Sequence, residues 1–299
     1  MKITVFGPGA WGTALAEAAA TAGHDVFLWA TDDTLARDIN SHKSPFLPGI
    51  RLHENIFSST NMDYAYDTDA WILASPAEFF RETTRKSRCF YKNQPILICS
   101  KGIDTRTGAT CAQMARDILG NFPGKIAVLS GPNFAAEVAR GMPAGATIGG
   151  TRKTFEIFSR VLPAMELERT NDLTGVEICG LGKNIAAVYA GFISNLGENE
   201  RAMRTAQIWR EIMDIGVSVG ARAQTFNMLC GLGDLLLTAT SQTSRNFTAG
   251  MALAAGKKTS NTAEGLTGIK TFHKIARKNN LKTPVFNAFY ASLKKIDNS

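Results

Sequence analysis

Long apolar runs are missing from this sequence. The longest, such as residues 185–193, fall well short of the roughly 18 to 20 residues that a membrane-spanning helix needs. The apolar run at residues 3–6 meets glycine at once and is too short for a secretory signal. We therefore expect a protein without a transmembrane segment that resides in the cytoplasm.

Cysteine and histidine are also scarce. The five cysteines are scattered and never form a C-x-x-C pair, which argues against a disulfide framework and favours a reducing compartment. The four histidines share no metal-ligand spacing, so we expect no metal.

Charge of one sign is in modest excess. Lysine and arginine number 33 against 26 acidic residues, and the net charge of +7 suits anionic partners such as phosphorylated metabolites and nucleotides. The excess is spread along the whole chain, and the aromatic residues are not interleaved with basic ones. No nucleic-acid partner is expected.

The amino-terminal half does contain short apolar segments that alternate with helical ones. The predicted strands are residues 3–6, 26–29, 71–74, 96–99 and 126–129. A helix predicted over residues 13–22 joins the first two strands and ends at Gly23. This order predicts an α/β fold with a Rossmann-like, doubly wound parallel sheet.

From about residue 177 onward, strand-like runs nearly vanish and alanine-rich helices take over. The predicted helices are residues 177–193, 200–215, 247–254, 268–278 and 284–294. A chain of 299 residues also suits two domains, because a single core seldom grows past about 250 to 300 residues. We predict a dinucleotide-binding domain of residues 1–174 and an all-helical substrate and catalytic domain of residues 175–299.

The turn after the first strand, residues 7–12 (GPGAWG), matches G-x-G-x-x-G. In this motif Gly7 makes the tight turn, Gly9 lets a pyrophosphate approach the backbone, and Gly12 lets the helix pack on the strand. The following helix N-terminus presents unpaired N–H groups to the phosphates. The motif predicts dinucleotide binding, and a glycine-rich turn that binds nothing is the alternative.

The choice between NAD and NADP depends on residues after the second strand. Asp32 lies where an acid would bind the ribose 2′-hydroxyl of NAD, although it is equally suited to cap a helix. Residues 30–32 contain no arginine for a 2′-phosphate, which favours NAD, while Arg37 and Lys43 keep NADP open.

Seven segments together resemble the bacterial NAD(P)-dependent glycerol-3-phosphate dehydrogenase family. They are residues 7–15 (GPGAWGTAL), 100–102 (SKG), 130–135 (SGPNFA), 182–184 (GKN), 231–235 (GLGDL), 244–246 (SRN) and 263–265 (AEG). They occur in the family's order.

The resemblance implies reversible hydride transfer between NAD(P)H and dihydroxyacetone phosphate, giving sn-glycerol 3-phosphate for phospholipid biosynthesis. It implies a catalytic pair, Lys183 and Asp234, with Lys183 as the general acid and base, and it also implies a homodimer. Positions that match substrate ligands are Lys101, Gly131, Asn133, Lys183, Asp234, Ser244, Arg245 and Asn246. Positions that match dinucleotide contacts are Trp11, Lys101, Ala135, Arg245 and Glu264, beside Gly7, Gly9, Ala10 and Gly12 of the turn.

The chemistry of these residues supports such roles, with simpler alternatives. An ammonium at Lys183, in an apolar helix, is costly to desolvate without a partner, and Asp234 is the natural carboxylate. Ser244, Arg245 and Asn246 suit a phosphate at a helix N-terminus. The alternatives are a surface lysine at position 183, helix caps at Asp234 and at Ser244 or Asn246, and solvated loop charges at Lys101 and Glu264.

The chain also departs from the family. Residues 29–31 read Trp-Ala-Thr where many relatives have Trp-x-Arg, and residues 206–208 read Ala-Gln-Ile where relatives have Thr-Arg-Gly. Gly182 replaces a larger residue before the lysine, at what we expect to be a flexible helix start. A dinucleotide-binding sensor with impaired catalysis is therefore the alternative function.

Overall fold

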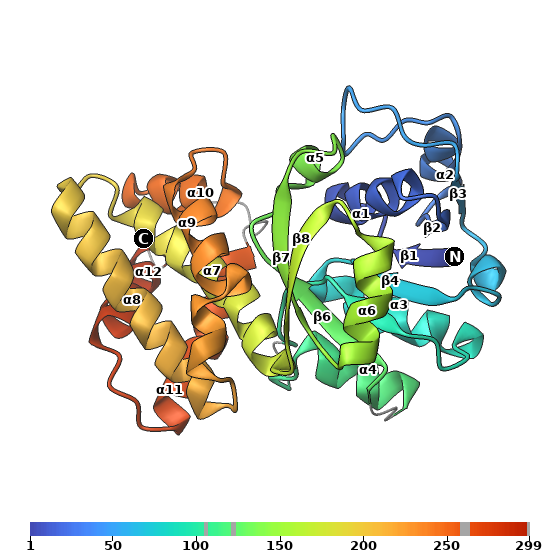
Figure 1. The fold of residues 1–299 in the computed structure, drawn as a ribbon. Helices are drawn as coiled ribbons and strands as arrows, with labels where there is room; N and C mark the ends of the chain where they lie inside the picture. Colours follow the sequence, from blue (N-terminus) through green and yellow to red (C-terminus); the bar gives the residue numbers. More distant parts are fainter. Residues whose placement is uncertain (105–106, 121–123, 258–263, 298–299) are drawn as a thin grey trace. The chain divides into compact units, whose positions relative to one another are not determined.

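The structure, a computed structural model, describes residues 1–104, 107–120, 124–257 and 264–297 (Figure 1). It divides into two compact units, which we call the sheet unit and the helical unit. The sheet unit consists of Met1–Ser100, Ala109–Leu129 and Asn133–Leu173. The helical unit consists of Lys101–Gly108, Ser130–Pro132 and Thr174–Ser299.

The sheet unit is built on one eight-stranded sheet in the order β3-β2-β1-β4-β5-β6-β7-β8. The strands are β1 (Lys2–Phe6), β2 (Asp25–Trp29), β3 (Ile56–Ser59), β4 (Ala70–Leu73), β5 (Ile96–Ile98), β6 (Ile126–Ser130), β7 (Ala144–Gly149) and β8 (Met165–Thr170). From β3 at one edge through β2, β1, β4 and β5 to β6, each strand pairs in parallel with the next. The chain reverses its direction of winding between β1 and β4, which confirms the predicted doubly wound, Rossmann-like sheet.

The sequence analysis did not predict three of the strands, β3, β7 and β8. The edge strand β3 has four residues and exposes Phe57 beside the buried Ile56. The segment of β7 is rich in glycine and alanine, which have weak strand preference. The other edge strand, β8, carries charged residues and is mostly half-buried, so it lacks a continuous apolar run.

Helices follow the strands of the sheet unit. They are α1 (Ala10–Thr21), α2 (Asp33–Asn40), α3 (Ala77–Ser87), α4 (Cys111–Leu119), α5 (Ala135–Val138) and α6 (Arg152–Val161), with short 3-10 turns η1 (Met62–Ala65) and η2 (Arg88–Phe90). Leu15 of α1 packs with Ile3 and Val5 of β1 in the main apolar core. The first helix begins at Ala10, inside the glycine-rich turn and earlier than predicted.

The helical unit surrounds one long buried helix, α7 (Leu173–Phe192). Around it lie α8 (Glu198–Ser218), α9 (Asp234–Thr240), α10 (Arg245–Ala254), α11 (Glu264–Lys278) and α12 (Pro284–Asp297), with the short turns η3 (Ala223–Asn227) and η4 (Leu229–Gly233). In the described part of the chain no helix is both long and apolar enough to cross a membrane.

Backbone contacts between glycines fix α10 against α7. A Cβ atom on Gly250 would overlap the carbonyl oxygen of Val188, and one on Gly191 would overlap that of Phe247. The two helices therefore cross with their backbones in contact, which side chains at these positions would prevent. This contact holds the first turns of α10 against the C-terminal end of α7.

A buried carboxylate anchors the last helix. Glu211 of α8 accepts hydrogen bonds from the backbone N–H groups of Val285 (3.0 Å) and Phe286 (2.7 Å) in the first turn of α12. Burial raises the pKa of Glu211 above its ordinary value, and the two backbone hydrogen bonds oppose that shift. These bonds satisfy two of the N–H groups that a helix start leaves without a partner.

The prediction that Gly182 lies at a helix start is wrong. Gly182 lies in the interior of α7, where a Cβ atom would be 2.5 Å from Cγ2 of Ile212. The neighbouring Leu181 packs against Gly268 of α11. The space of the missing side chain is thus filled from α8, so this departure from the family leaves α7 well packed.

We predict that Gly182→Leu destabilises the protein by about 1–3 kcal/mol, because the added side chain overlaps Ile212 in a filled core. Ile212→Ala, which removes the overlapping atoms, should make the double variant more stable than the sum of the two single effects predicts. Urea unfolding followed by circular dichroism measures all four proteins. An unchanged unfolding midpoint in Gly182→Leu would contradict this packing.

Candidate active site

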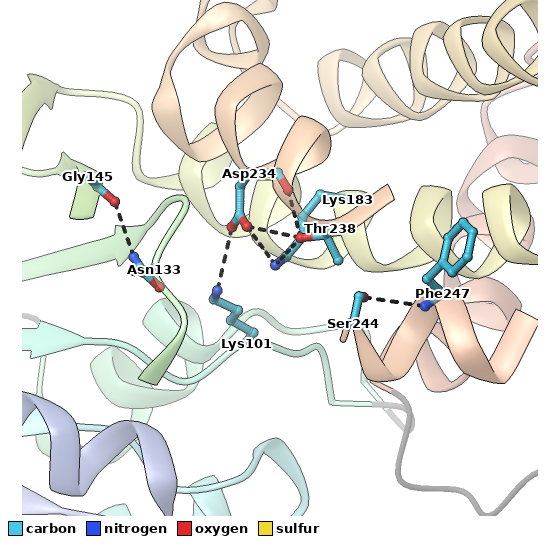
Figure 2. Close-up of polar contacts among 8 residues, drawn as sticks. All are labelled: Lys101, Asn133, Gly145, Lys183, Asp234, Thr238, Ser244 and Phe247. Carbon is cyan, nitrogen blue, oxygen red and sulfur yellow. Dashed lines mark hydrogen bonds and ion pairs between the residues drawn. The ribbon is translucent and has the colours of Figure 1, made fainter. Parts of the chain in front are cut away.

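A buried ion pair joins α7 to the start of α9. Lys183 is 7% exposed and Asp234 is 1% exposed, and 2.8 Å separates Nζ of the lysine from Oδ1 of the carboxylate (Figure 2). Desolvating either charge alone would be costly, and the partner offsets that cost for both. Lys183 is therefore a buried lysine, and the surface-lysine alternative fails.

A second ammonium group approaches the same carboxylate. Lys101 follows β5, and its Nζ lies 3.7 Å from Oδ2 of Asp234, with 17% of its side chain exposed. The Oδ2 atom is buried and accepts no hydrogen bond from the described residues. Two ammonium groups thus share one carboxylate, and the cluster keeps one positive charge that favours an anion or a developing oxyanion.

Thr238 completes this cluster, and sequence reasoning missed it. Its Oγ1 accepts a hydrogen bond from Nζ of Lys183 (3.0 Å) and donates one to the backbone carbonyl of Asp234 (2.7 Å). The same hydroxyl lies 3.2 Å from Oδ1 of Asp234, so it contacts both members of the ion pair. The available signal was spacing, because a threonine four residues after an aspartate shares its face of a helix. The sequence analysis assigned no helix to residues 234–240.

The loop after β6 meets α7 one turn before Lys183. A Cβ atom on Gly180 would lie 2.8 Å from Oγ of Ser130 and 3.7 Å from Cδ of Lys101. Gly131 follows Ser130 in this loop, within the helical unit. Ser130, which precedes Gly131, and the side chain of Lys101 therefore both pack against α7, the helix that contains Lys183.

Asn133 belongs to the sheet unit and is described there. Its Nδ2 donates a hydrogen bond to the backbone carbonyl of Gly145 in β7, over 3.3 Å (Figure 2). The amide thus ties its loop to a strand, and its oxygen stays available as an acceptor.

The segment predicted as a phosphate site opens α10. Ser244 is the N-cap, and its Oγ accepts a hydrogen bond from the backbone N–H of Phe247 (3.4 Å). Asn246 accepts one from the backbone N–H of Gly265 (3.0 Å) and so ties α10 to α11. Arg245 is exposed in the first turn of α10. The capping alternative is realised at Ser244, and the Arg245 side chain is exposed.

The glycine-rich turn has the geometry that its motif requires. Gly7 has a φ of +117°, and a Cβ atom there would be 2.5 Å from the backbone of Ala74 and Ser75. A Cβ atom on Gly12 would overlap the carbonyl of Gly7, whereas no atom lies within 4 Å of that position on Gly9. Helix α1 starts at Ala10 without a side-chain cap. An open backbone before uncapped N–H groups fits a pyrophosphate.

Trp11 and Ala135, the other predicted dinucleotide residues of the sheet unit, share one small apolar cluster with Ala10. Trp11 is half-buried, and its Nε1 is buried without a hydrogen-bond partner among the described residues. Glu264 is the first residue of α11, and its side chain lies outside the described residues. Its contact with a dinucleotide therefore stays a prediction.

Asp32 acts as a helix cap. Its Oδ1 accepts a hydrogen bond from the backbone N–H of Leu35 over 2.9 Å at the start of α2. Arg37 donates to Oγ1 of Thr34 in the same helix. The capping role accounts for Asp32 without a ribose, so this residue does not separate NAD from NADP.

A Rossmann-like sheet with an open glycine-rich turn, together with a helical unit that buries a lysine, defines an NAD(P)-dependent dehydrogenase. Family models place it further: residues 2–156 match the NAD-dependent glycerol-3-phosphate dehydrogenase N-terminus, and residues 172–298 match the C-terminus of the same family. The chain belongs to this family, as its sequence motifs predicted.

Similar proteins agree with this assignment. Two bacterial proteins named glycerol-3-phosphate dehydrogenase (NAD(P)+) are those of Parvibaculum lavamentivorans, 35% identical over 96% of this chain and 90% of that protein, and of Nitratidesulfovibrio vulgaris, 37% identical over 98% and 94%. The crystal structure of glycerol-3-phosphate dehydrogenase from Coxiella burnetii is 25% identical, covers 99% of this chain and 98% of its own, and has a TM-score of 0.89.

We predict that Thr238→Val lowers kcat by about 10- to 100-fold with little change in KM, because the lysine loses a hydrogen bond worth about 1.5–3 kcal/mol. Thr238→Ser keeps the hydroxyl and should stay within about threefold of the parent activity. Thr240→Val, on the exposed side of α9, is the matched control for the loss of a threonine hydroxyl. Steady-state kinetics decide, and equal activity of Thr238→Val and Thr240→Val would remove Thr238 from the site.

Proposed function

We propose that this protein catalyses reversible hydride transfer between NAD(P)H and dihydroxyacetone phosphate, giving sn-glycerol 3-phosphate. The observation that carries the proposal is the buried cluster of Lys183, Asp234, Lys101 and Thr238 in a chain of the glycerol-3-phosphate dehydrogenase family. Reduction of a ketone places negative charge on its oxygen, and this cluster carries a fixed excess of positive charge in a site shielded from water.

In the proposed reaction Lys183 is the general acid and base. As the carbonyl carbon gains a hydride, the Lys183 ammonium donates a hydrogen bond to the oxygen and then passes it a proton. In the reverse direction the neutral amine takes the proton from the hydroxyl. Asp234 and Thr238 hold the Nζ atom in place through hydrogen bonds of 2.8 and 3.0 Å, so little reorganisation accompanies the transfer.

The dinucleotide, when bound, supplies or accepts the hydride. Its pyrophosphate suits the open backbone at Gly9 and the uncapped start of α1, with Gly7 and Gly12 shaping the turn. We propose Ala10, Trp11 and Ala135 as further contacts in the sheet unit, and Lys101, Arg245 and Glu264 from the helical unit.

The substrate phosphate is proposed to bind Arg245. A guanidinium donates two parallel N–H bonds to a phosphate, and the start of α10 adds its own attraction for an anion. Lys101, Gly131, Asn133, Ser244 and Asn246 are proposed to complete the substrate site. In this proposal Ser244 and Asn246 act mainly by shaping the start of α10, because their side-chain oxygens already accept backbone hydrogen bonds.

The cellular setting is part of the same proposal. The product would serve phospholipid biosynthesis in the cytoplasm, and the active protein would be a homodimer. The competing proposal, a dinucleotide-binding sensor with impaired catalysis, rested on the departures at Gly182 and at residues 206–208. Gly182 is well packed, and of residues 206–208 Ala206 and Gln207 are exposed while Ile208 is buried in α8. Lys183 keeps its hydrogen bonds to Asp234 and Thr238 beside these departures, which supports the enzyme over the sensor.

We predict that the protein oxidises NADH or NADPH at 340 nm only when dihydroxyacetone phosphate is present, and that Lys183→Ala abolishes this turnover. Dinucleotide affinity, measured by fluorescence titration, should change less than about threefold in the variant, because the glycine-rich turn lies in the other unit. Dinucleotide binding without turnover in the parent protein would favour the sensor, and equal loss of both properties in the variant would give Lys183 a structural role.

A further inference from the structure

Three arginines line one hollow of the sheet unit. Arg81, Arg85 and Arg88 follow the spacing i, i+4, i+7, which places them on one side of α3 and its continuation η2. With Asp117 and Ile118 of α4 they line an open hollow of about 410 Å³. Helices α3 and α4 are neighbours (Figure 1), and residues of both helices line the hollow.

The charges in this hollow are unbalanced. Three guanidinium groups face a single carboxylate, that of Asp117. No carboxylate of the described residues forms an ion pair with Arg85 or Arg88, whereas Glu82 on α3 is paired with Lys86. Arg85 and Arg88 outnumber the single carboxylate of Asp117 in this open hollow, and the excess of positive charge attracts an anion.

The hollow lies at the edge of the sheet opposite to the glycine-rich turn. In an open parallel sheet ligands bind at the carboxyl ends of the strands, where the turn at Gly7 follows β1. Helix α3 starts after the carboxyl end of β4 and runs toward the amino end of β5, so its last turn, with Arg85, and the following Arg88 lie at the opposite edge. Asp117 and Ile118, at the end of α4 before β6, lie at this same edge.

We propose that this hollow is a second anion-binding site, for a compact phosphorylated small molecule with about two negative charges. Arginine forks suit phosphoryl oxygens, which accept two parallel N–H bonds from each guanidinium. The volume of about 410 Å³ is in the range of small-molecule sites, and the buried Ile118 offers an apolar wall to an organic portion.

The test is calorimetric titration of the full chain with inorganic pyrophosphate at low ionic strength. The double variant Arg85→Gln/Arg88→Gln should weaken binding by about tenfold or more, because it removes both guanidinium groups that lack a carboxylate partner. Asp117→Asn should tighten binding by about threefold, because it removes the only negative charge in the hollow. Both substitutions change exposed side chains, so folding is preserved.

Arg116→Gln is the matched control, since Arg116 is exposed on α4 beside Asp117 but does not line the hollow. It should leave the affinity within about twofold. Pyrophosphate bound at the glycine-rich turn or near Arg245 contributes equally to every variant, so the differences report on the hollow alone. Equal affinities in the parent and the double variant would overturn the proposal. So would a loss in Arg116→Gln as large as in the double variant, or weaker binding by Asp117→Asn.

Discussion

The carboxylate of Asp234 is the constraint on which the proposed chemistry depends. It is almost fully buried and lies between the ammonium groups of Lys183 and Lys101. Without it the lysine helix would carry an uncompensated buried charge, a loss that costs about 3–5 kcal/mol when one partner of such a pair is removed. With it, an ammonium is held at a fixed position in a largely apolar unit, where it acts on a ketone oxygen far more strongly than in water.

The helical unit is built to keep that position fixed. Glycines at the crossing of α7 and α10 bring the two backbones into contact, and Gly182 admits the side chain of Ile212. Thr238 uses the helical repeat of α9 to place its oxygen beside Lys183. The ends of α10 and α11 are joined by Asn246, and Glu211 fastens α12 to α8. Packing and hydrogen bonding in the helical unit therefore stabilise the position of the Lys183 ammonium beside Asp234.

Apolar periodicity predicted the sheet, and a short motif predicted the glycine-rich turn. The pairing of Lys183 with Asp234 depended on the resemblance to the family, because the residues alone left a surface lysine as an alternative. Sequence reasoning missed β7 and β8, whose residues lack a strand-like pattern, and it placed Gly182 at a helix start because propensity ignores the tertiary contact with Ile212. The contact of Thr238 with Lys183 was not predicted, since it depends on the short helix α9, which sequence reasoning did not assign. The sequence left Asp32 as either a ribose ligand or a helix cap, and its hydrogen bond from the backbone N–H of Leu35 is that of a helix cap.

Chemical rescue tests the central claim most directly, that Asp234 holds an ammonium group that transfers the proton. In Lys183→Ala, added ethylamine should restore NADH or NADPH oxidation with dihydroxyacetone phosphate in a concentration-dependent way, because Asp234 and Thr238 can bind the small ammonium in the space of the lost side chain. In Lys183→Ala/Asp234→Asn the rescue should fall by about tenfold or more, since the carboxylate that attracts the ammonium is gone. Equal rescue in both variants, or none in the first, would contradict the account.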